Sequence, residues 1–289
     1  MSDGGHGRLV LVATPIGNLG DLSPRARDAL ADADLICCED TRRTRALLSA
    51  AGIPAGNRLL SLHGHNEAQR LGRVSDCVTA GGTVVVVSDA GTPGSSDPGA
   101  GLAAQLAEAG ETVTTVPGPS AVIAALVLSG LPTDRFCVEG FLPRKGAERR
   151  RRVTALMKDE RTSVVFEAPG RVAATVAELA GVDPGRSVAV VRELTKIHEE
   201  VWRGALRDAV EAFAAEPPRG EVVLVVGGAP PAAPPDEDDV EGAVRTALAD
   251  DPSAGPRQVA ERVATALGIP RRRVYDAALR IRDGVTGVP

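Results

Sequence analysis

The stretch that decides the fold is Thr83-Val84-Val85-Val86-Val87, which runs directly into Ser88-Asp89-Ala90-Gly91-Thr92-Pro93. An uninterrupted run of valines is typical of a strand that is covered on both faces, as in the middle of a parallel sheet. The loop that follows contains glycine and proline, which both interrupt regular structure. A buried strand that leads into such a loop, and then into a helix, predicts an open α/β sheet.

The same pattern recurs on both sides of this stretch. Short apolar strands are expected over residues 9–13 and 35–38 before it and over residues 112–116 after it. Helices are expected between the strands, and they begin at capping residues such as Ser23 and Ser120. Since strands that alternate with helices are joined by right-handed crossovers, the first half of the chain predicts a parallel sheet.

The pattern changes after about residue 118. Strands are expected over residues 136–139, 163–166, 188–192, 200–203 and 221–226, with helices between most of them. The two strands around Lys196 are joined by a short turn, which forces an antiparallel pair. This half therefore predicts a mixed sheet in a second α/β domain.

The composition of the chain places a linker after these two domains. Residues 227–235 are glycine, alanine and proline, and acidic residues follow. Beyond the linker, short helical patterns end in a pair that resembles a helix-turn-helix, with Arg271, Arg272 and Arg273 at the start of the last helix. We expect an N-terminal domain over residues 1–118, a second domain over 119–228, a linker over 229–239 and a helical segment over 240–289.

Length and composition exclude several classes of protein. The chain has 289 residues, of which 43% are hydrophobic and 25% charged, so a disordered or fibrous chain is not expected. The formal net charge of -5 gives no global attraction for polyanions, so any basic surface must be local. The longest apolar run, residues 121–128, falls short of the roughly 20 residues that span a bilayer. We expect a cytoplasmic protein with reduced, structural cysteines and no membrane contact.

The loops that follow the strands form the predicted site. In an open α/β sheet, ligands bind beyond the carboxyl ends of the strands. One such loop alone is more often a plain turn, but several at one sheet edge favour a ligand site. The chain has no Gly-Lys-Ser/Thr phosphate loop, and the glycines at Gly99 and Gly101 lie behind Pro98 rather than directly after a strand. His63 and His65 have no further ligand pair, so we do not expect a metal site.

Basic residues are concentrated beside two of these loops. A run of basic residues usually forms a solvated helix face. The run at residues 144–152 follows the loop at Phe141, however, and this position favours a surface that binds a polyanion. The expected RNA-contacting residues are Arg42, Arg43, Arg144, Lys145, Arg149, Arg150, Arg151 and Arg152.

Several ordered blocks along the chain resemble the signature blocks of a known family, the small-subunit ribosomal RNA methyltransferases I of the tetrapyrrole methylase superfamily. The resemblance covers about residues 8–228. The blocks are Ala13-Thr14-Pro15-Ile16-Gly17-Asn18-Leu19, Glu39-Asp40-Thr41-Arg42, His65-Asn66-Glu67, Ser88-Asp89-Ala90-Gly91-Thr92-Pro93, Asp97-Pro98-Gly99, Pro117-Gly118-Pro119-Ser120, Gly140-Phe141-Leu142-Pro143 and Arg192-Glu193-Leu194-Thr195-Lys196.

The resemblance implies a fold, a cofactor and a reaction. The fold is a two-domain tetrapyrrole-methylase-like α/β fold with a parallel-sheet N-terminal domain, a mixed-sheet second domain and a small C-terminal helical segment. The activity is 2′-O-methylation of a cytidine in the decoding region of small-subunit ribosomal RNA by a homodimer that uses S-adenosylmethionine. The implied partner is that RNA or the assembled small subunit. Cofactor contacts carried over position by position are Thr14, Pro15, Ile16, Gly17, Ser88, Asp89, Ala90, Gly91, Thr92, Pro93, Ser120, Ala121 and Phe141.

The reaction needs little from the protein beyond positioning, but a base would assist a ribose hydroxyl, which is a weak nucleophile. The candidates are Asp89, Glu167 and His65, in that order of preference, and the sequence does not choose among them. One block departs from the family, because Gly170 stands where the family usually has histidine.

Two other functions are consistent with the sequence. One is methylation of a tetrapyrrole or of a modified protein histidine by an enzyme of the same superfamily. The other is a protein without catalysis, in which the helical tail binds nucleic acid and the α/β body senses a small ligand. The basic run and the arginines of the last helix favour RNA as the substrate over the first of these.

Overall fold

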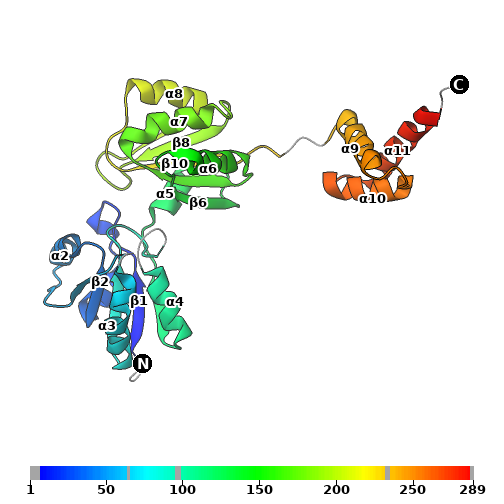
Figure 1. Cartoon of the computed structure of the whole chain (residues 1–289). Helices are drawn as coiled ribbons and strands as arrows, with labels where there is room; N and C mark the ends of the chain where they lie inside the picture. Colours follow the sequence, from blue (N-terminus) through cyan, green and yellow to red (C-terminus); the bar gives the residue numbers. More distant parts are fainter. Residues whose placement is uncertain (1–6, 64–65, 95–98, 232–234, 287–289) are drawn as a thin grey trace. The chain divides into compact units, whose positions relative to one another are not determined.

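The computed structural model describes residues 7–63, 66–94, 99–231 and 235–286, with side chains described as far as residue 282 (Figure 1). The chain divides into two compact units, Met1–Ala229 and Pro230–Pro289. The first unit contains two five-stranded sheets with their helices, and the second contains three helices. This is the α/β fold class that the sequence predicts.

The first sheet is entirely parallel and has the strand order β3-β2-β4-β1-β5. Its strands are β1 (Arg8–Val12), β2 (Leu35–Cys38), β3 (Leu59–Ser61), β4 (Thr83–Val87) and β5 (Thr112–Val116). The valine strand β4 lies at the centre, and Val84, Val85 and Val86 are fully buried, as predicted for a strand covered on both faces. The sequence analysis missed β3, which is only three residues long.

Helices cover both faces of the first sheet. One face packs against α1 (Pro24–Asp32) and α2 (Thr41–Ala50), and the other packs against α3 (Glu67–Thr79) and α4 (Ala100–Glu108). Cys37 and Cys38 lie in this core, and burial raises the pKa of the Cys37 thiol to about 12. A thiol with so high a pKa stays protonated, which agrees with the predicted structural role of these cysteines.

The second sheet is mixed and has the order β6-β7-β10-β8-β9. Its strands are β6 (Phe136–Phe141), β7 (Thr162–Glu167), β8 (Ser187–Arg192), β9 (Glu200–Ala205) and β10 (Val222–Val226). As predicted from the short connection around Lys196, β8 and β9 are antiparallel. The strand β10 also runs antiparallel to β7 and β8, whereas β6 and β7 are parallel.

Helices also cover both faces of the second sheet. The helices α6 (Gly146–Lys158), α7 (Val172–Ala180) and α8 (Leu206–Ala215) contribute to the core on one face, and α5 (Ala121–Ser129) covers the other. Ile16, from the loop after β1, packs into the same cluster as α5 and β10. The first loop of the parallel sheet is therefore in direct contact with the second sheet.

The second unit consists of α9 (Glu237–Asp250), α10 (Pro256–Leu267) and α11 (Arg271–Thr286). These helices bury a core of their own, which includes Val244, Val259 and Val274. The N-terminus of α9 is closed by a capping box between Asp236 and Asp239. The two units divide after Ala229, and α9 begins at Glu237, inside the stretch 229–239 that the sequence predicts as a linker. The predicted domain boundaries stay predictions. None of the helices described is long and apolar enough to cross a membrane.

Candidate functional site

A cavity of about 470 Å³ lies between the loops of the parallel sheet and the second sheet. This volume is within the range of ~300–1,000 Å³ that is typical of small-molecule sites. Its lining residues are Ile16, Asp89, Ala90, Gly91, Thr92, Ser120, Ala121, Val122, Phe141, Phe166, Glu167, Ala168, Pro169, Leu194, Gly220, Glu221, Val222 and Val223. The structure thus brings the loops after β1, β4 and β5 together at one sheet edge, and we call this space the first cavity.

Hydrogen bonds hold two of these loops together. Thr14 and Gly91 exchange backbone hydrogen bonds, with N–H to O distances of 2.9 and 3.1 Å. The Thr14 hydroxyl donates to the Ser88 carbonyl at 3.2 Å, and the Ser88 hydroxyl donates to the Gly91 carbonyl at 3.1 Å. These contacts fix the loop backbone before any ligand binds, which lowers the entropic cost of binding.

Gly91 has a backbone conformation that favours glycine. Its φ is +87°, and a Cβ there would lie 3.2 Å from Cγ2 of Ile16 and 3.4 Å from the Pro119 carbonyl oxygen. A larger residue would therefore strain the backbone and push against the wall of the first cavity. The sequence predicts Gly91 as a cofactor contact, and the structure places it in the wall of the first cavity.

The first cavity also offers an aromatic surface and a helix N-terminus. The rings of Phe141 and Phe166 have centroids 5.6 Å apart and are tilted by 41°. Apolar ring faces suit a flat ligand such as adenine. Ser120 caps α5, and the first backbone N–H groups of a helix can donate to a carboxylate. The residues present therefore fit S-adenosylmethionine, which carries both an adenine and a carboxylate.

A second cavity, of about 530 Å³, adjoins the first. Its lining residues are Thr14, Pro15, Ile16, Gly17, Leu19, Arg43, Thr44, Ala46, Leu47, Ala50, Ser88, Asp89, Ala90, Lys196 and Glu221. Ile16, Asp89, Ala90 and Glu221 line both cavities. A ligand in one cavity and a ligand in the other would therefore meet at these residues. Of the predicted cofactor contacts, Pro15, Gly17, Ser88 and Thr14 line the second cavity rather than the first, and Pro93 lines neither.

Asp89 is the acidic candidate that lies between the two cavities. One carboxylate oxygen accepts the Asp40 backbone N–H at 3.1 Å, and the other lies 3.4 Å from Nη1 of Arg43. The side chain is 20% exposed, so it is partly open to the cavities. These contacts orient the Asp89 carboxylate and leave it partly accessible to a ligand in either cavity.

Glu167 lines the first cavity but its carboxylate is fully engaged. The side chain is 0% exposed. It accepts hydrogen bonds from the Thr175 hydroxyl at 2.6 Å and from the Ala168 N–H at 2.9 Å, and Nε of Arg171 lies 3.2 Å away. This geometry is typical of a structural buried ion pair. The third candidate base, His65, lies outside the described residues.

The neighbours of His65 do not line either cavity. The Asn66 amide donates to the Ser61 carbonyl and accepts from the His63 N–H, and Glu67 accepts the Leu102 N–H at 2.6 Å. Neither Asn66 nor Glu67 lines the first or the second cavity, and both side chains bond to backbone groups.

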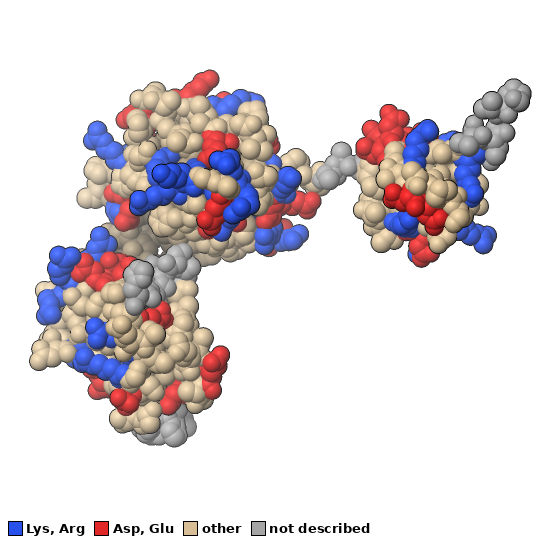
Figure 2. All heavy atoms as spheres, in the orientation of Figure 1, with Lys and Arg blue, Asp and Glu red and all other residues tan. Residues whose placement is uncertain are grey.

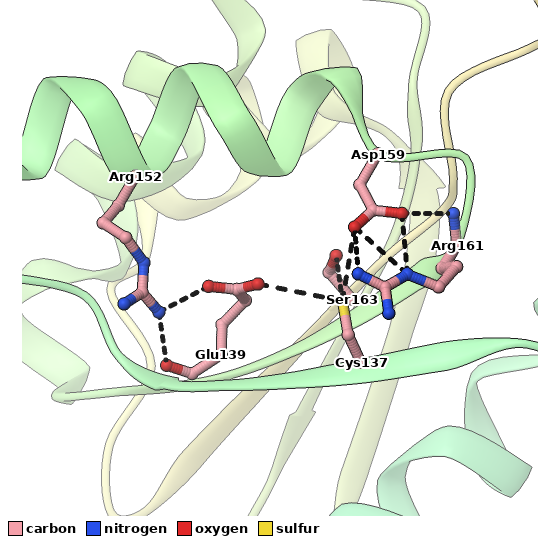
Figure 3. Close-up of polar contacts among 6 residues, drawn as sticks. All are labelled: Cys137, Glu139, Arg152, Asp159, Arg161 and Ser163. Atoms are coloured by element: carbon pink, nitrogen blue, oxygen red, sulfur yellow. Dashed lines mark hydrogen bonds and ion pairs between the residues drawn. The ribbon is translucent and has the colours of Figure 1, made fainter.

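The basic run on α6 separates into two groups. Arg149 is buried and donates to Glu178, Thr175 and the Pro143 carbonyl, so it supports the fold. Arg152 donates to the backbone and the side chain of Glu139, as Figure 3 shows. The exposed members are Arg144, Lys145, Arg150, Arg151 and also Arg152, which pairs with Glu139, and Figure 2 shows basic side chains gathered over α6. The available basic surface is thus smaller than the sequence suggests.

The contacts around Cys137 are also structural. Figure 3 shows Glu139 and Asp159 on either side of the Cys137 thiol, with Arg161 beside Asp159. Hydrogen bonds from Arg161 lower the pKa of Asp159 to about 2, whereas burial raises the pKa of Cys137. The thiol is therefore not a reactive nucleophile.

On the first sheet, Arg42 and Arg43 both have acidic partners. Arg42 pairs with Asp40, and its hydrogen bonds lower the pKa of Asp40 to about 2. Arg43 pairs with Asp89 and lines the second cavity. Arg43 is thus placed to contact a ligand there.

No functional role is predicted from the sequence for Glu193-Leu194-Thr195-Lys196. The structure places Leu194 in the first cavity and Lys196 in the second. Burial alone would lower the pKa of Lys196, but hydrogen bonds to Glu193 and Glu221 outweigh burial and raise it. Glu221 lines both cavities, but the sequence analysis did not predict it as a site residue, because the residues around it in the sequence form no recognisable motif.

These two sheets have the fold of the tetrapyrrole methylase class. The family model for Tetrapyrrole (Corrin/Porphyrin) Methylases matches residues 8–210. The uroporphyrin-III-C-methyltransferase of Thermus thermophilus superposes with a TM-score of 0.54 at 22% identity, over 77% of this chain and 94% of that one. A structure of the Thermus thermophilus enzyme described as complexed with S-adenyl homocysteine has a TM-score of 0.51 at 20% identity, over 76% of this chain and 97% of that one.

Curated relatives are similar over nearly the whole chain. A protein of Mycobacterium tuberculosis named ribosomal RNA small subunit methyltransferase I is 46% identical over 97% of this chain and 98% of its own length. A protein of Synechocystis with the same name is 43% identical over 96% of this chain and 100% of its own length. The chain therefore belongs to the ribosomal RNA small subunit methyltransferase I family. This membership confirms the resemblance seen in the sequence, and it agrees with the predicted cofactor.

Proposed function

We propose that this protein transfers a methyl group from S-adenosylmethionine to the 2′-hydroxyl of a cytidine in the decoding region of small-subunit ribosomal RNA. The relatives' names supply the substrate class. The observation that carries the proposal is the position of Asp89 at the boundary of two adjoining cavities. One cavity fits the methyl donor, and the other has room for a nucleotide.

The first cavity is the proposed cofactor site. Bound there, S-adenosylmethionine supplies an electrophilic methyl group on a positively charged sulfur. The loop backbone at Gly91, which hydrogen bonds to Thr14 hold in place, and the rings of Phe141 and Phe166 would contact it. Apolar walls around the reacting groups exclude water, which favours a displacement in which charge disappears.

The second cavity is the proposed acceptor site. Leu19 and Leu47 offer apolar surface for a base, and Arg43 and Lys196 offer positive charge for a phosphate. A 2′-hydroxyl at the shared boundary would lie next to Asp89. We assign Asp89 the role of general base: its carboxylate would accept the hydroxyl proton as the oxygen forms its bond to the methyl carbon and the bond between that carbon and sulfur breaks, with the electron pair going to sulfur. Glu167 is a structural residue in this proposal.

The exposed basic residues directly before α6 and in its first turns are the proposed contact to the RNA backbone. Arg144, Lys145, Arg150 and Arg151 are exposed, and phosphate contacts need only accessible charge. Arg149 has no part in this surface, because its guanidinium is buried against Glu178 and Thr175.

A homodimer and a cytoplasmic location complete the proposal. The helix α5 is apolar on all sides, yet the side chains of Ile123 and Val127 are exposed, and Val127 is 68% exposed. A helix of this kind is normally covered on all sides. A second copy of the chain is the partner that the family resemblance implies for this face.

The test is incubation with labelled S-adenosylmethionine and unmethylated small ribosomal subunits, followed by digestion of the RNA to nucleosides. The expected product is labelled 2′-O-methylcytidine. Label on a base or on another nucleoside would contradict the proposed acceptor. A parallel incubation with a tetrapyrrole and with ribosomal protein tests the activities of the other methylases in the superfamily. If no methyl group is transferred to RNA, tetrapyrrole or protein, the result would favour a protein that binds its ligands without catalysis.

A further inference from the structure

The loop between β8 and β9 carries the most exposed large hydrophobic side chain among the described residues. Ile197 lies near the middle of this loop and is 97% exposed. A single exposed apolar residue is common on protein surfaces and by itself indicates nothing. The loop around it is unusual, however, in its backbone, its hydrogen bonds and its position.

The backbone of this loop is strained. Glu193 has a φ of 50° and Thr195 a φ of 62°, and these are the non-glycine residues with positive φ in the described chain. The second is β-branched, for which this conformation is a true outlier. The Thr195 hydroxyl is also buried without a hydrogen-bond partner among the described residues. Strain of this kind persists where surrounding contacts impose it, and it is concentrated at functional sites.

Hydrogen bonds fix the loop in this shape. The Thr195 N–H donates to the Glu199 carboxylate at 2.7 Å, and the Lys196 ammonium donates to Glu193 at 2.8 Å and Glu221 at 3.0 Å. The Glu221 N–H also donates to the Glu193 carboxylate at 2.9 Å. The loop is therefore a rigid support, and Ile197 is presented to solvent on a fixed base.

The position of the loop relates it to the acceptor. Lys196 lines the second cavity and Leu194 lines the first. Ile197 directly follows Lys196 in the chain, about 3.8 Å away from Cα to Cα, and its side chain is exposed. If the acceptor nucleotide occupies the second cavity, Ile197 lies close enough to that cavity for contact with RNA next to this nucleotide.

We propose that Ile197 is an apolar wedge that enters the base stack next to the acceptor nucleotide and holds that nucleotide in the second cavity. The proposal rests on the proposed function. Bases of a folded RNA are stacked, and an enzyme that acts on one nucleotide must separate it from its neighbours. Isoleucine is among the side chains that proteins insert between base steps for this purpose. The rigid loop supplies the support that such an insertion needs.

The test compares methylation of small ribosomal subunits by the wild type, Ile197→Ala and Ile197→Phe. Because burying an exposed isoleucine side chain is worth about 1.5–3 kcal/mol, kcat/KM for Ile197→Ala should fall about ten- to a hundredfold. Ile197→Phe, which is also large and apolar, should stay close to the wild type. Val182→Ala is the matched control, since Val182 is 55% exposed and lines neither cavity. Cofactor affinity should be equal in all four proteins.

A second measurement separates a wedge from an ordinary contact. In the complex with wild-type protein, bases in the bound RNA should become more reactive to dimethyl sulfate, and this increase should be absent with Ile197→Ala. Equal kinetics or equal reactivity for the two proteins would overturn the proposal. A change from dimer to monomer on sedimentation of Ile197→Ala would also overturn it, because Ile197 would then be a subunit contact. If the wild-type protein methylates no RNA, the proposed function is refuted. The comparison of dimethyl sulfate reactivity would still test whether Ile197 separates the bases, because that measurement requires only that the RNA is bound.

Discussion

The two sheets contribute to the candidate site in different ways. The parallel sheet supplies loops of small residues whose backbone shapes the cavities, with Asp89 as a partly open acid. The mixed sheet supplies charged side chains that are held in ion pairs, such as Glu167 with Arg171 and Lys196 with Glu193. The difference shows that a charged residue at a cavity wall is not by itself a catalytic residue. What distinguishes Asp89 from Glu167 is that the Asp89 side chain is 20% exposed, although it pairs with Arg43, whereas the Glu167 side chain is fully buried.

The largest expected effect is on turnover when Asp89 is changed. Asp89→Asn keeps the shape and the hydrogen bond from Asp40 but removes a base that can take up a proton. Loss of general-base catalysis should lower kcat by about 10²- to 10⁴-fold. The measurement is single-turnover methylation of small ribosomal subunits, together with calorimetric titration of S-adenosylmethionine, whose affinity should not change.

Glu167→Gln is the matched contrast from the mixed sheet. It removes the charge that faces Arg171, and breaking a buried ion pair should cost about 3 kcal/mol in the free energy of unfolding. The folded fraction should keep most of its turnover. If Glu167→Gln abolished turnover while Asp89→Asn did not, the assignment of the two acids would be reversed.

The next effect concerns the basic run of α6. Changing Arg150 and Arg151 together to Gln should reduce the slope of log affinity against log salt by about 1–2 and weaken RNA binding about tenfold, because each phosphate contact releases counterions. Arg149→Gln should leave the slope unchanged and lower the melting temperature instead, since it breaks the buried contacts to Glu178 and Thr175. An unchanged slope in the double variant would mean that this helix face is merely solvated.

A smaller effect is expected from the backbone of the parallel sheet. Gly91→Ala and Gly110→Ala both put a side chain at positive φ, +87° and +82°, and each should cost about 1–2 kcal/mol in stability. Gly110 has no neighbour within 4 Å of the added Cβ, whereas Gly91 faces Ile16 and Pro119. Titration of S-adenosylmethionine should therefore show weaker binding for Gly91→Ala alone. Equal affinity in the two variants would disprove the role of this loop in the cofactor site.

The smallest expected effect is the pH dependence of the loop between β8 and β9. Hydrogen bonds from Lys196 and from the Glu221 N–H lower the pKa of Glu193 below its usual value of 4.5. A depressed carboxyl pKa contributes stability that is present above about pH 4.5 and is lost as the pH falls through the lowered value. Thermal unfolding should therefore show Glu193→Gln less stable than the wild type at pH 7, with the difference shrinking below pH 4.5. A difference that stayed constant down to pH 3 would exclude this linkage.

Much of the fold could be predicted because it depends on local patterns. The valine run of β4 predicts a central strand, and the short connection around Lys196 predicts an antiparallel pair, since both follow from few residues. The three-residue strand β3 has too little pattern to be recognised. The loops of the site could be located from the order of strands alone, because carboxyl ends of parallel strands share one edge.

The parts of the site that escaped prediction depend on contacts between distant residues. The sequence gives Asp89 and Glu167 the same chemistry, and only their partners separate an accessible acid from a buried ion pair. Likewise, Arg149 and Arg150 are adjacent, yet one is buried and the other exposed. The positive φ of Thr195 has no signature in the sequence, because the surrounding contacts impose it.

The most direct test is a crystal structure of the protein with S-adenosylhomocysteine bound. The account predicts the adenosyl group in the cavity walled by Phe141, Phe166 and the Gly91 loop, with the sulfur directed toward Asp89 and the adjoining cavity left open to the acceptor. A ligand bound outside this cavity, or with its sulfur turned away from Asp89, would contradict it.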